Sequence, residues 1–222
     1  MFLFGIVLVL NADAQIRWGL KIGGNLSSLN AKEEGVKIEG LKSRFGFHAS
    51  TMMEWSFISN FALQPELQFI ANGFNWEING KSAESVINAK FKGVMYQLQL
   101  PVNLKYKVGS NNVKFFATTG PYAGLGIYGK LLIDKYLIDG KDYSKDLELE
   151  YKDIDLYNFI FNNELPRIFF QRFDFGINAG IGVEIYKFII GVNYQTSLIN
   201  ISGVANSNYK MGTFQFSAGY FF

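Results

Sequence analysis

The sequence predicts an all-β protein, a transmembrane antiparallel up-and-down β-barrel of eight strands that is preceded by a signal peptide. Three observations predict it. Apolar and polar residues alternate with a period of two over segments of roughly a dozen residues, whereas an average soluble strand has only about five or six. Aromatic residues make up 17% of the chain, which does not suit a disordered protein. Short and long connections follow one another in turn between the segments.

Eight segments alternate in this way, and they cover residues 16–28, 43–57, 60–73, 92–108, 112–128, 171–185, 187–200 and 211–222. The sixth segment shows the two faces clearly, because Phe173, Phe175 and Ile177 lie on one and Asp174 and Asn178 on the other. A closed soluble core would not bury charged groups without strong cause. We therefore expect the apolar face to contact lipid and the polar face to line the interior, as in outer-membrane barrels.

The lengths of the connections indicate how the barrel is oriented. Short connections fall near 57–60, 108–112 and 185–188, and long ones near 29–42, 74–91, 129–170 and 201–210. Outer-membrane barrels have short periplasmic turns and longer extracellular loops. An even number of strands then leaves both ends of the barrel on the periplasmic side.

The chain begins with an apolar run, MFLFGIVLVL, that is too short to span a bilayer. Ala12-Asp13-Ala14 follows, a small-residue pattern typical of a signal-peptide cleavage site. We expect cleavage after Ala14, so that residues 1–14 form the signal peptide and residues 15–222 the outer-membrane barrel. Because no Lys or Arg precedes the run, a start further upstream and an ordinary hydrophobic N-terminus stay open as alternatives.

The last strand carries a second localisation signal. Phe214, Phe216, Tyr220 and Phe222 share one face with Ala218. We expect this face to contact lipid, with Phe222 among the aromatic residues of the periplasmic interface. The pattern resembles the C-terminal signal of outer-membrane proteins, which implies the barrel-assembly machinery and outer-membrane lipid as partners.

Composition and motifs argue against several other classes of protein. The formal charge of +2 offers no basic excess for binding nucleic acid. The chain has no cysteine, so it forms neither disulfides nor thiolate metal sites. Glycine-rich stretches at 23–25 and 124–129 precede no predicted helix and therefore lack phosphate-binding geometry. We expect no cofactor, no bound metal and no enzymatic activity.

Five blocks of sequence together with the last strand resemble the porin-family outer-membrane β-barrel domain of Gram-negative bacteria, which includes PorT-like proteins of a protein-secretion system and small OmpX-type barrels. The blocks are GLKIGGNLSSL (19–29), FALQPELQF (61–69), LQLPVNLKYKVG (98–109), TGPYAGLGI (119–127) and RFDFGINAGIGVEI (172–185). The resemblance implies an eight-stranded barrel but no single activity, because such folds host many roles. Pro65, Pro101 and Pro121 lie inside predicted strands, and we expect a bulge at each.

The polar face of the predicted strands collects charged residues. Alternation places twelve titratable side chains toward the lumen: Arg17, Lys21, Arg44, His48, Glu54, Glu66, Lys105, Lys107, Lys114, Arg172, Asp174 and Glu184. An eight-stranded barrel is just wide enough for side chains to fill its interior. We expect these charges to pair into a network that plugs the barrel, with Phe116, Tyr122 and Tyr128 adding bulk. An ion pathway lined by the same charges stays open as the alternative.

His48 is the single histidine of the chain. Ser50 and Glu54 follow it on the same face, and a catalytic interpretation would combine the three. Their spacing is not that of a known triad, and an isolated lumen histidine is far more often packed or hydrogen-bonded. We therefore expect no catalytic role for His48.

The connection 129–170 is the longest, and we expect a protein partner to bind there. Asp139-Gly140 predicts a hairpin that extends the flanking strands above the membrane, and residues 78–81 predict the same in the second long connection. A calcium site is conceivable in a run of five acidic residues, but their spacing lacks the glycine and the last bidentate glutamate of the known loop motif: Asp146, Glu148, Glu150, Asp153 and Asp155. We expect a solvated acidic loop instead.

Two functions fit these observations. The first is a non-enzymatic integral outer-membrane protein that acts through its extracellular loops, as a structural or interaction component of a secretion or surface assembly. The second is a passive pore or carrier for small solutes, in which the excess of lumen cations would favour anions. Ion conductance through the lumen distinguishes the two.

Overall fold

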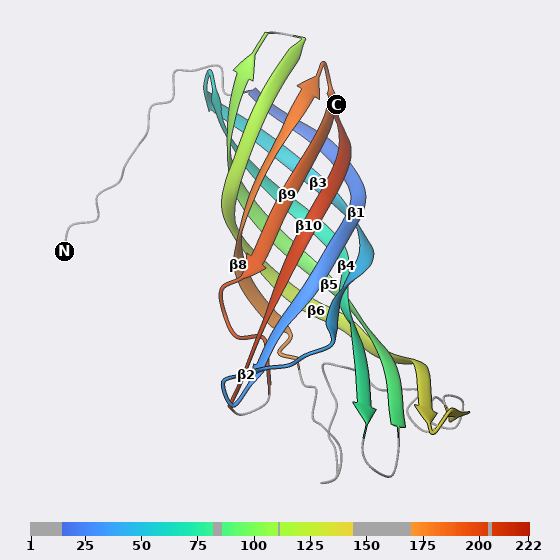
Figure 1. Cartoon of the computed structure of the whole chain (residues 1–222). Helices are drawn as coiled ribbons and strands as arrows, with labels where there is room; N and C mark the ends of the chain where they lie inside the picture. The colour runs from blue at the N-terminus through green and yellow to red at the C-terminus, as the bar shows by residue number, and fades with distance from the viewer. Residues whose placement is uncertain (1–14, 82–85, 111, 144–169, 204–205) are drawn as a thin grey trace, which may run out of the picture.

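Figure 1 shows the computed structural model of the chain, which describes residues 15–81, 86–110, 112–143, 170–203 and 206–222. No helix among these residues is long and apolar enough to cross a membrane. Eight long strands form the wall of the molecule: β1 (Gln15–Glu33), β3 (Leu41–Ile58), β4 (Phe61–Lys81), β5 (Val86–Gly109), β6 (Val113–Ile138), β8 (Phe173–Ile185), β9 (Phe188–Ser197) and β10 (Ser207–Phe221). Two short strands, β2 (Val36–Lys37) and β7 (Lys141–Asp142), pair with β1 and β6.

The eight long strands close into an antiparallel barrel. Each strand pairs with the next along the chain, in the order β1, β3, β4, β5, β6, β8, β9, β10. β10 also pairs with β1, from Gly19 opposite Phe221 to Glu33 opposite Ser207, and this pairing closes the ring. The predicted eight-stranded up-and-down barrel is therefore confirmed.

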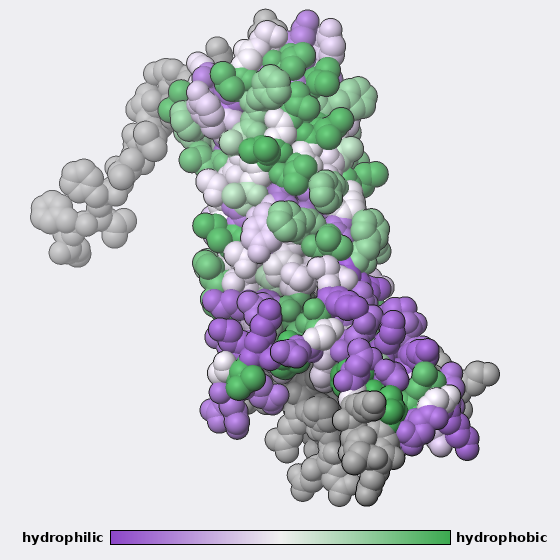
Figure 2. All heavy atoms as spheres, in the orientation of Figure 1, coloured by the Kyte–Doolittle hydropathy of each residue, from purple (hydrophilic) through white to green (hydrophobic). Residues whose placement is uncertain are grey.

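The outer surface of the barrel is apolar over most of its height. Along β8, Phe173, Phe175 and Ile177 are exposed, whereas Asp174 and Asn178 are buried inside. Figure 2 shows a broad hydrophobic band above a hydrophilic end, and the long connections lie at that end in Figure 1. An apolar surface of this extent is stable only against hydrocarbon, so the polar face lines the interior as predicted.

Three adjacent strands continue well beyond the apolar band. β4, β5 and β6 have 21, 24 and 26 residues, against 13 for β8 and 10 for β9. About 9–11 tilted residues suffice to span a bilayer. Residues 74–91, predicted as a connection, belong to β4 and β5 outside the undescribed tip at 82–85. We call residues 75–81, 86–92 and 130–138 the projecting sheet, and it leaves the barrel at the long-loop end (Figure 1).

The hairpin predicted at Asp139-Gly140 is present at the end of β6. Both residues have positive φ, 51° and 80°, as a two-residue hairpin turn requires. Ile138 pairs with Lys141 across the turn. The second strand of this hairpin is the two-residue β7. The hairpin therefore does not connect β6 directly to β8, the next strand of the barrel wall.

The three strand prolines do not produce the expected bulges. The register is unchanged across Pro65 in β4, Pro101 in β5 and Pro121 in β6. A proline removes one donor from the ladder but adds no residue, so neighbouring strands stay in step. The expectation of bulges at these positions is wrong.

The register shifts elsewhere, at two places between β3 and β4 and at two places between β5 and β6. Tyr96 pairs with Tyr128 and Gln97 with Gly126, so Ile127 is an extra residue. A second shift lies between the pairs of Lys90 and Phe91. The first bulge turns Tyr128 outward, where its side chain is 45% exposed. Tyr128 therefore does not add bulk to the lumen, because an inserted residue inverts the alternation beyond it.

Candidate functional site

The lumen collects most of the titratable side chains chosen from the sequence. Seven of the twelve are buried: His48, Glu54, Glu66, Lys105, Lys107, Asp174 and Glu184. Four are partly buried: Arg17, Lys21, Arg44 and Lys114. Arg172 is exposed, because it precedes the first residue of β8 and lies outside the ladder. Its Nη1 donates a hydrogen bond to the Gly126 carbonyl at 3.2 Å, which places it at the rim and not in the interior.

Glu54 on β3 is the centre of a charge cluster near the short-turn end. Its Oε1 accepts hydrogen bonds from Arg17 Nη2 at 2.8 Å and Lys107 Nζ at 2.5 Å, and its Oε2 accepts one from Lys105 Nζ at 2.8 Å. Glu184 on β8 accepts two more from Arg17, each at 2.6 Å. Strands β1, β3, β5 and β8 all contribute, so the cluster spans the lumen from wall to wall.

Two aromatic rings pack against the cations of this cluster. The guanidinium carbon of Arg17 lies 3.8 Å from the centroid of the Phe221 ring, and Lys105 Nζ lies 4.4 Å from that of Phe116. Phe221 is fully buried. Our sequence analysis missed Phe221 because it considered the outward face of the last strand. Its position between two outward-facing aromatic residues could have identified it as a lumen residue.

A second ion pair and a layer of amides fill the middle of the lumen. Lys21 Nζ lies 2.5 Å from Glu66 Oε2, and Gln64 Nε2 donates to Glu66 Oε1 at 2.7 Å. Beyond this pair, side-chain amides hydrogen-bond with one another across the barrel: Gln68, Asn72, Gln97, Gln99, Gln195 and Gln215. A buried amide layer of this kind is stable only when its members satisfy one another.

His48, Ser50 and Glu54 do not form a catalytic relay. His48 Nε2 lies 2.9 Å from Ser217 Oγ, Ser50 Oγ donates to Glu66, and Glu54 binds the cations described above. His48 is also tightly packed, because a Cβ at Gly23 would lie 2.7 Å from its Cε1 atom. The three side chains therefore have separate partners, which supports a packed role for the histidine.

Apolar side chains form a buried cluster at the long-loop mouth of the lumen. The Phe170 ring lies 5.9 Å from that of Phe74 and 5.7 Å from that of Tyr209. The buried members of this mouth cluster are Leu29, Ala31, Phe74, Met95, Phe170, Ile201, Tyr209 and Met211. Just below it, Tyr122 and Ser197 both donate hydrogen bonds to Asp174 Oδ2, at 3.0 and 3.1 Å.

A small open space remains in the described part of the lumen. A cavity of about 40 Å³ lies beside Lys21, Asn103 and Asn193, and it has room for a few water molecules at most. Within the described ranges, no group of three or more His, Asp or Glu side chains could hold a metal ion. The acidic run from Asp146 to Asp155, where a calcium site was conceivable, lies outside the described residues, as do residues 1–14 with the expected signal peptide.

Comparison with known proteins agrees with this geometry. The family model described as outer membrane protein beta-barrel domain matches residues 11–203, which is most of the chain. The chain belongs to this family. No curated protein matches it. The protein is therefore a Gram-negative outer-membrane barrel whose apolar band lies in lipid, and by the rule for such barrels the short-turn end is periplasmic and the long-loop end extracellular.

Similar solved structures are small outer-membrane barrels. Ail, the attachment invasion locus protein of Yersinia pestis, solved in complex with the heparin analogue sucrose octasulfate, is 17% identical with a TM-score of 0.40, and 94% of this chain and 99% of that chain are covered. OprG from Pseudomonas aeruginosa is 14% identical with a TM-score of 0.43, over 94% and 97% of the two chains. Neisserial surface protein A is 12% identical with a TM-score of 0.37, over 91% and 97%. At these identities and TM-scores the likeness carries no conclusion about the role of this chain.

Proposed function

We propose that this outer-membrane barrel is non-enzymatic and acts through its extracellular end, as a structural or interaction component of a surface or secretion assembly. The observation that carries the proposal is a contrast between the two parts of the molecule. The lumen is filled with side chains, whereas the projecting sheet extends far beyond what crossing the membrane requires. Strand length beyond what is needed to cross the membrane is best explained by contacts outside the membrane.

The layers of side chains in the lumen support a plug over a path for solutes within the described residues. A solute would have to pass the Glu54 cluster, the amide layer and the apolar mouth cluster in turn. Each layer joins opposite walls of the barrel, and opening the first would separate buried charges from their partners, which is costly. This supports a structural role for the network over an ion pathway.

The projecting sheet presents a firm polar surface to the exterior. Glu77 Oε2 accepts a hydrogen bond from Lys42 at 2.5 Å, and Glu77 Oε1 lies 3.3 Å from Lys90 Nζ, so this carboxylate joins β3, β4 and β5. On the other face, the rings of Trp76 and Phe91 pack 5.7 Å apart. Ladder hydrogen bonds and these contacts hold the surface in one shape, which favours recognition of a partner. Residues 130–138 of the expected partner segment 129–170 belong to this sheet, whereas 144–169 lie outside the described residues.

Assembly into the membrane requires recognition of the last strand, and we propose that the outward face of β10 is what is recognised. Phe214, Phe216, Tyr220 and Phe222 are exposed by between 37% and 64% on that face. These are the residues that the barrel-assembly machinery would contact. They remain available after folding only to lipid.

A passive pore for small solutes is the second candidate. The excess of cations in the lumen favours it, because Arg17, Lys105 and Lys107 share two carboxylates near the periplasmic end, and Lys114 is paired opposite Glu184 on the neighbouring strand. Such a surplus would attract anions. The filled cross-section argues against it.

Planar-bilayer conductance of the refolded protein separates the two functions. Folding is first confirmed by the heat-dependent shift in gel mobility. We expect a correctly folded protein to give no stable conductance steps. Stable, anion-selective steps that shrink in Lys107→Ala would favour the pore and contradict our proposal.

Site-specific cross-linking in intact cells tests the extracellular role. The chain has no cysteine, so Lys135→Cys places a single thiol on the projecting sheet and Lys187→Cys places one near the periplasmic turn between β8 and β9. We expect a recurring cross-linked partner from Lys135→Cys and none from the control. If neither position yields a product, or the control alone does, the interaction role is refuted.

A further inference from the structure

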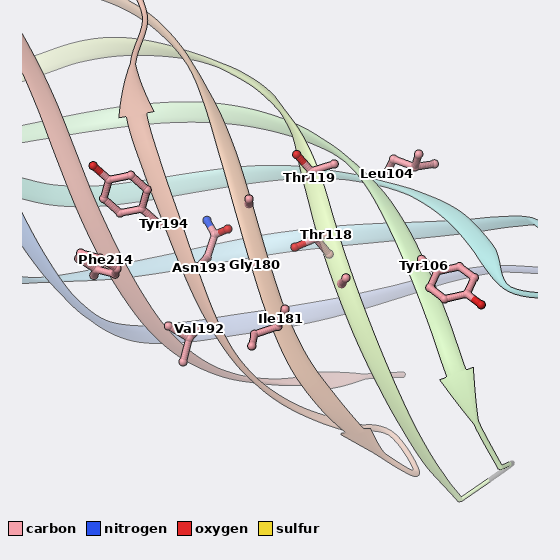
Figure 3. A pocket seen from close by; sticks show the side chains of 12 residues that line it. Leu104, Tyr106, Thr118, Thr119, Gly180, Ile181, Val192, Asn193, Tyr194 and Phe214 are labelled. Atoms are coloured by element: carbon pink, nitrogen blue, oxygen red, sulfur yellow. The ribbon is translucent and has the colours of Figure 1, made fainter.

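The outer wall of the barrel contains a hollow in its lipid-facing surface. Two neighbouring rows of paired residues run across β5, β6, β8 and β9 here. In the first row, Thr119 and Ala179 stand between the larger Leu104 and Tyr194. In the second row, Ala117 is paired with the larger Tyr106 on β5. The small side chains leave a hollow with a volume of about 530 Å³ (Figure 3).

The walls of this hollow are held open by aromatic contacts. Tyr106 on β5 packs against Phe61 on β4, with ring centroids 5.0 Å apart. On the other side, Tyr194 packs against Phe214 at 4.6 Å, and its hydroxyl lies over Gly212 of β10, where a Cβ would be 2.8 Å away. Both tyrosine rings thus lean away from the floor toward neighbouring strands. The hollow is formed before any ligand arrives, so binding need not displace a side chain.

The lining of the hollow offers a ligand almost no polar group. None of its twelve lining residues is charged. Thr119 Oγ1 donates a hydrogen bond to the Asn178 carbonyl at 3.0 Å, so the threonine presents its methyl group to the outside. A ligand that fits this surface is hydrocarbon, because any polar group placed here would be left without a partner.

We propose that this hollow is a binding site for the acyl chain of a phospholipid from the periplasmic leaflet, retained by the protein as a bound lipid. Its lining residues Leu104, Ile181 and Tyr194 are exposed on the outer wall of a protein that resides in the outer membrane, so lipid chains surround the hollow. It is nearer the periplasmic end, because Phe61, beside Tyr106, is the first residue after the short turn between β3 and β4. The Tyr106 hydroxyl points toward that end in Figure 3, where tyrosines meet the polar part of lipids.

Native mass spectrometry of the protein released from a mild detergent tests the site. We expect wild type purified from membranes to retain one phospholipid. Ala117→Leu with Ala179→Leu fills the floor and should lower the retained fraction about ten-fold, the change that losing the burial of two methylene groups produces. Ala49→Leu with Ala218→Leu places the same bulk on outward residues of β3 and β10 and should retain lipid as wild type does.

The remaining outcomes are equally definite. Because the lining has no charge, wild type reloaded with phosphatidylcholine or phosphatidylethanolamine of equal chain length should retain both alike, and a strong headgroup preference would overturn the proposal. Lipid retention that is unchanged in Ala117→Leu/Ala179→Leu, or absent in wild type, would overturn it as well. A wild-type dimer that dissociates in the filled variant would show that a second copy of the chain, and not lipid, occupies the hollow. The gel mobility shift confirms that each variant folds.

Discussion

Glu54 is the residue whose loss should disturb the lumen most. The structure gives it three cationic partners, Arg17, Lys105 and Lys107, at 2.5 to 2.8 Å. Glu54 and Lys105 are fully buried. In Glu54→Gln, the three cations would share Glu184 alone, and Lys105 Nζ lies 3.7 Å from it. Removing one partner of a buried ion pair costs about 3–5 kcal/mol, so we expect the free energy of unfolding to fall by about that amount.

Lys105→Met is the matched variant, because it removes a positive charge from a cluster in which cations outnumber carboxylates. Glu54 then keeps Arg17 and Lys107, and the methionine side chain packs against the Phe116 ring that Lys105 already contacts. Because Glu54 keeps two cationic partners, this variant leaves no buried charge without a counter-charge. We therefore expect Lys105→Met to be much milder than Glu54→Gln.

Urea unfolding in lipid vesicles, followed by the fluorescence of the three tryptophans, measures both changes. The gel mobility shift reports the folded fraction independently. If Lys105→Met destabilises the barrel as much as Glu54→Gln does, the surplus of cations is not what governs the cluster. Equal and small effects of both variants would show that the cluster is solvated and does not seal the lumen.

Two further predictions concern the extracellular end. Gly93→Ala places a Cβ 2.4 Å from the Phe74 ring, so we expect overpacking of the mouth cluster and a loss of about 1–3 kcal/mol in urea unfolding, whereas Gly80→Ala, whose nearest atom is 4.0 Å away, should have little effect. Hydrogen bonds from its two lysine partners hold the pKa of Glu77 below its ordinary value. The ionised carboxylate therefore stabilises the projecting sheet fully at pH values above the ordinary pKa of a glutamate. This stabilisation is lost as the pH falls through the lowered pKa of Glu77. Hydrogen exchange of the β4 and β5 amides in this sheet should therefore accelerate at acid pH while that of the membrane-spanning amides does not, and equal acceleration of both would contradict this account.

The sequence alone determined the class of fold and the sense of its two faces. Alternation with a period of two is a local property of a strand, so Phe173 and Asp174 could be assigned to opposite faces without knowledge of their neighbours. Asp139-Gly140 predicted its hairpin for the same reason, since the positive φ angles of such a turn depend on the residues within it. Most of the lumen residues also followed from alternation.

Only the tertiary structure decided which lumen residues meet and where alternation fails. Glu54 and Glu184 lie on strands that are not neighbours. Arg17 on β1 binds both carboxylates, and its position between them depends on how β1 pairs with β10 to close the ring. Three further features also depend on the register between strands: the extra residue Ile127, the additional length of strands β4, β5 and β6, and the hollow beside Ala179. Register is set by packing across the whole ring, and a one-residue shift reverses every face beyond it, so no single segment of sequence contains that information.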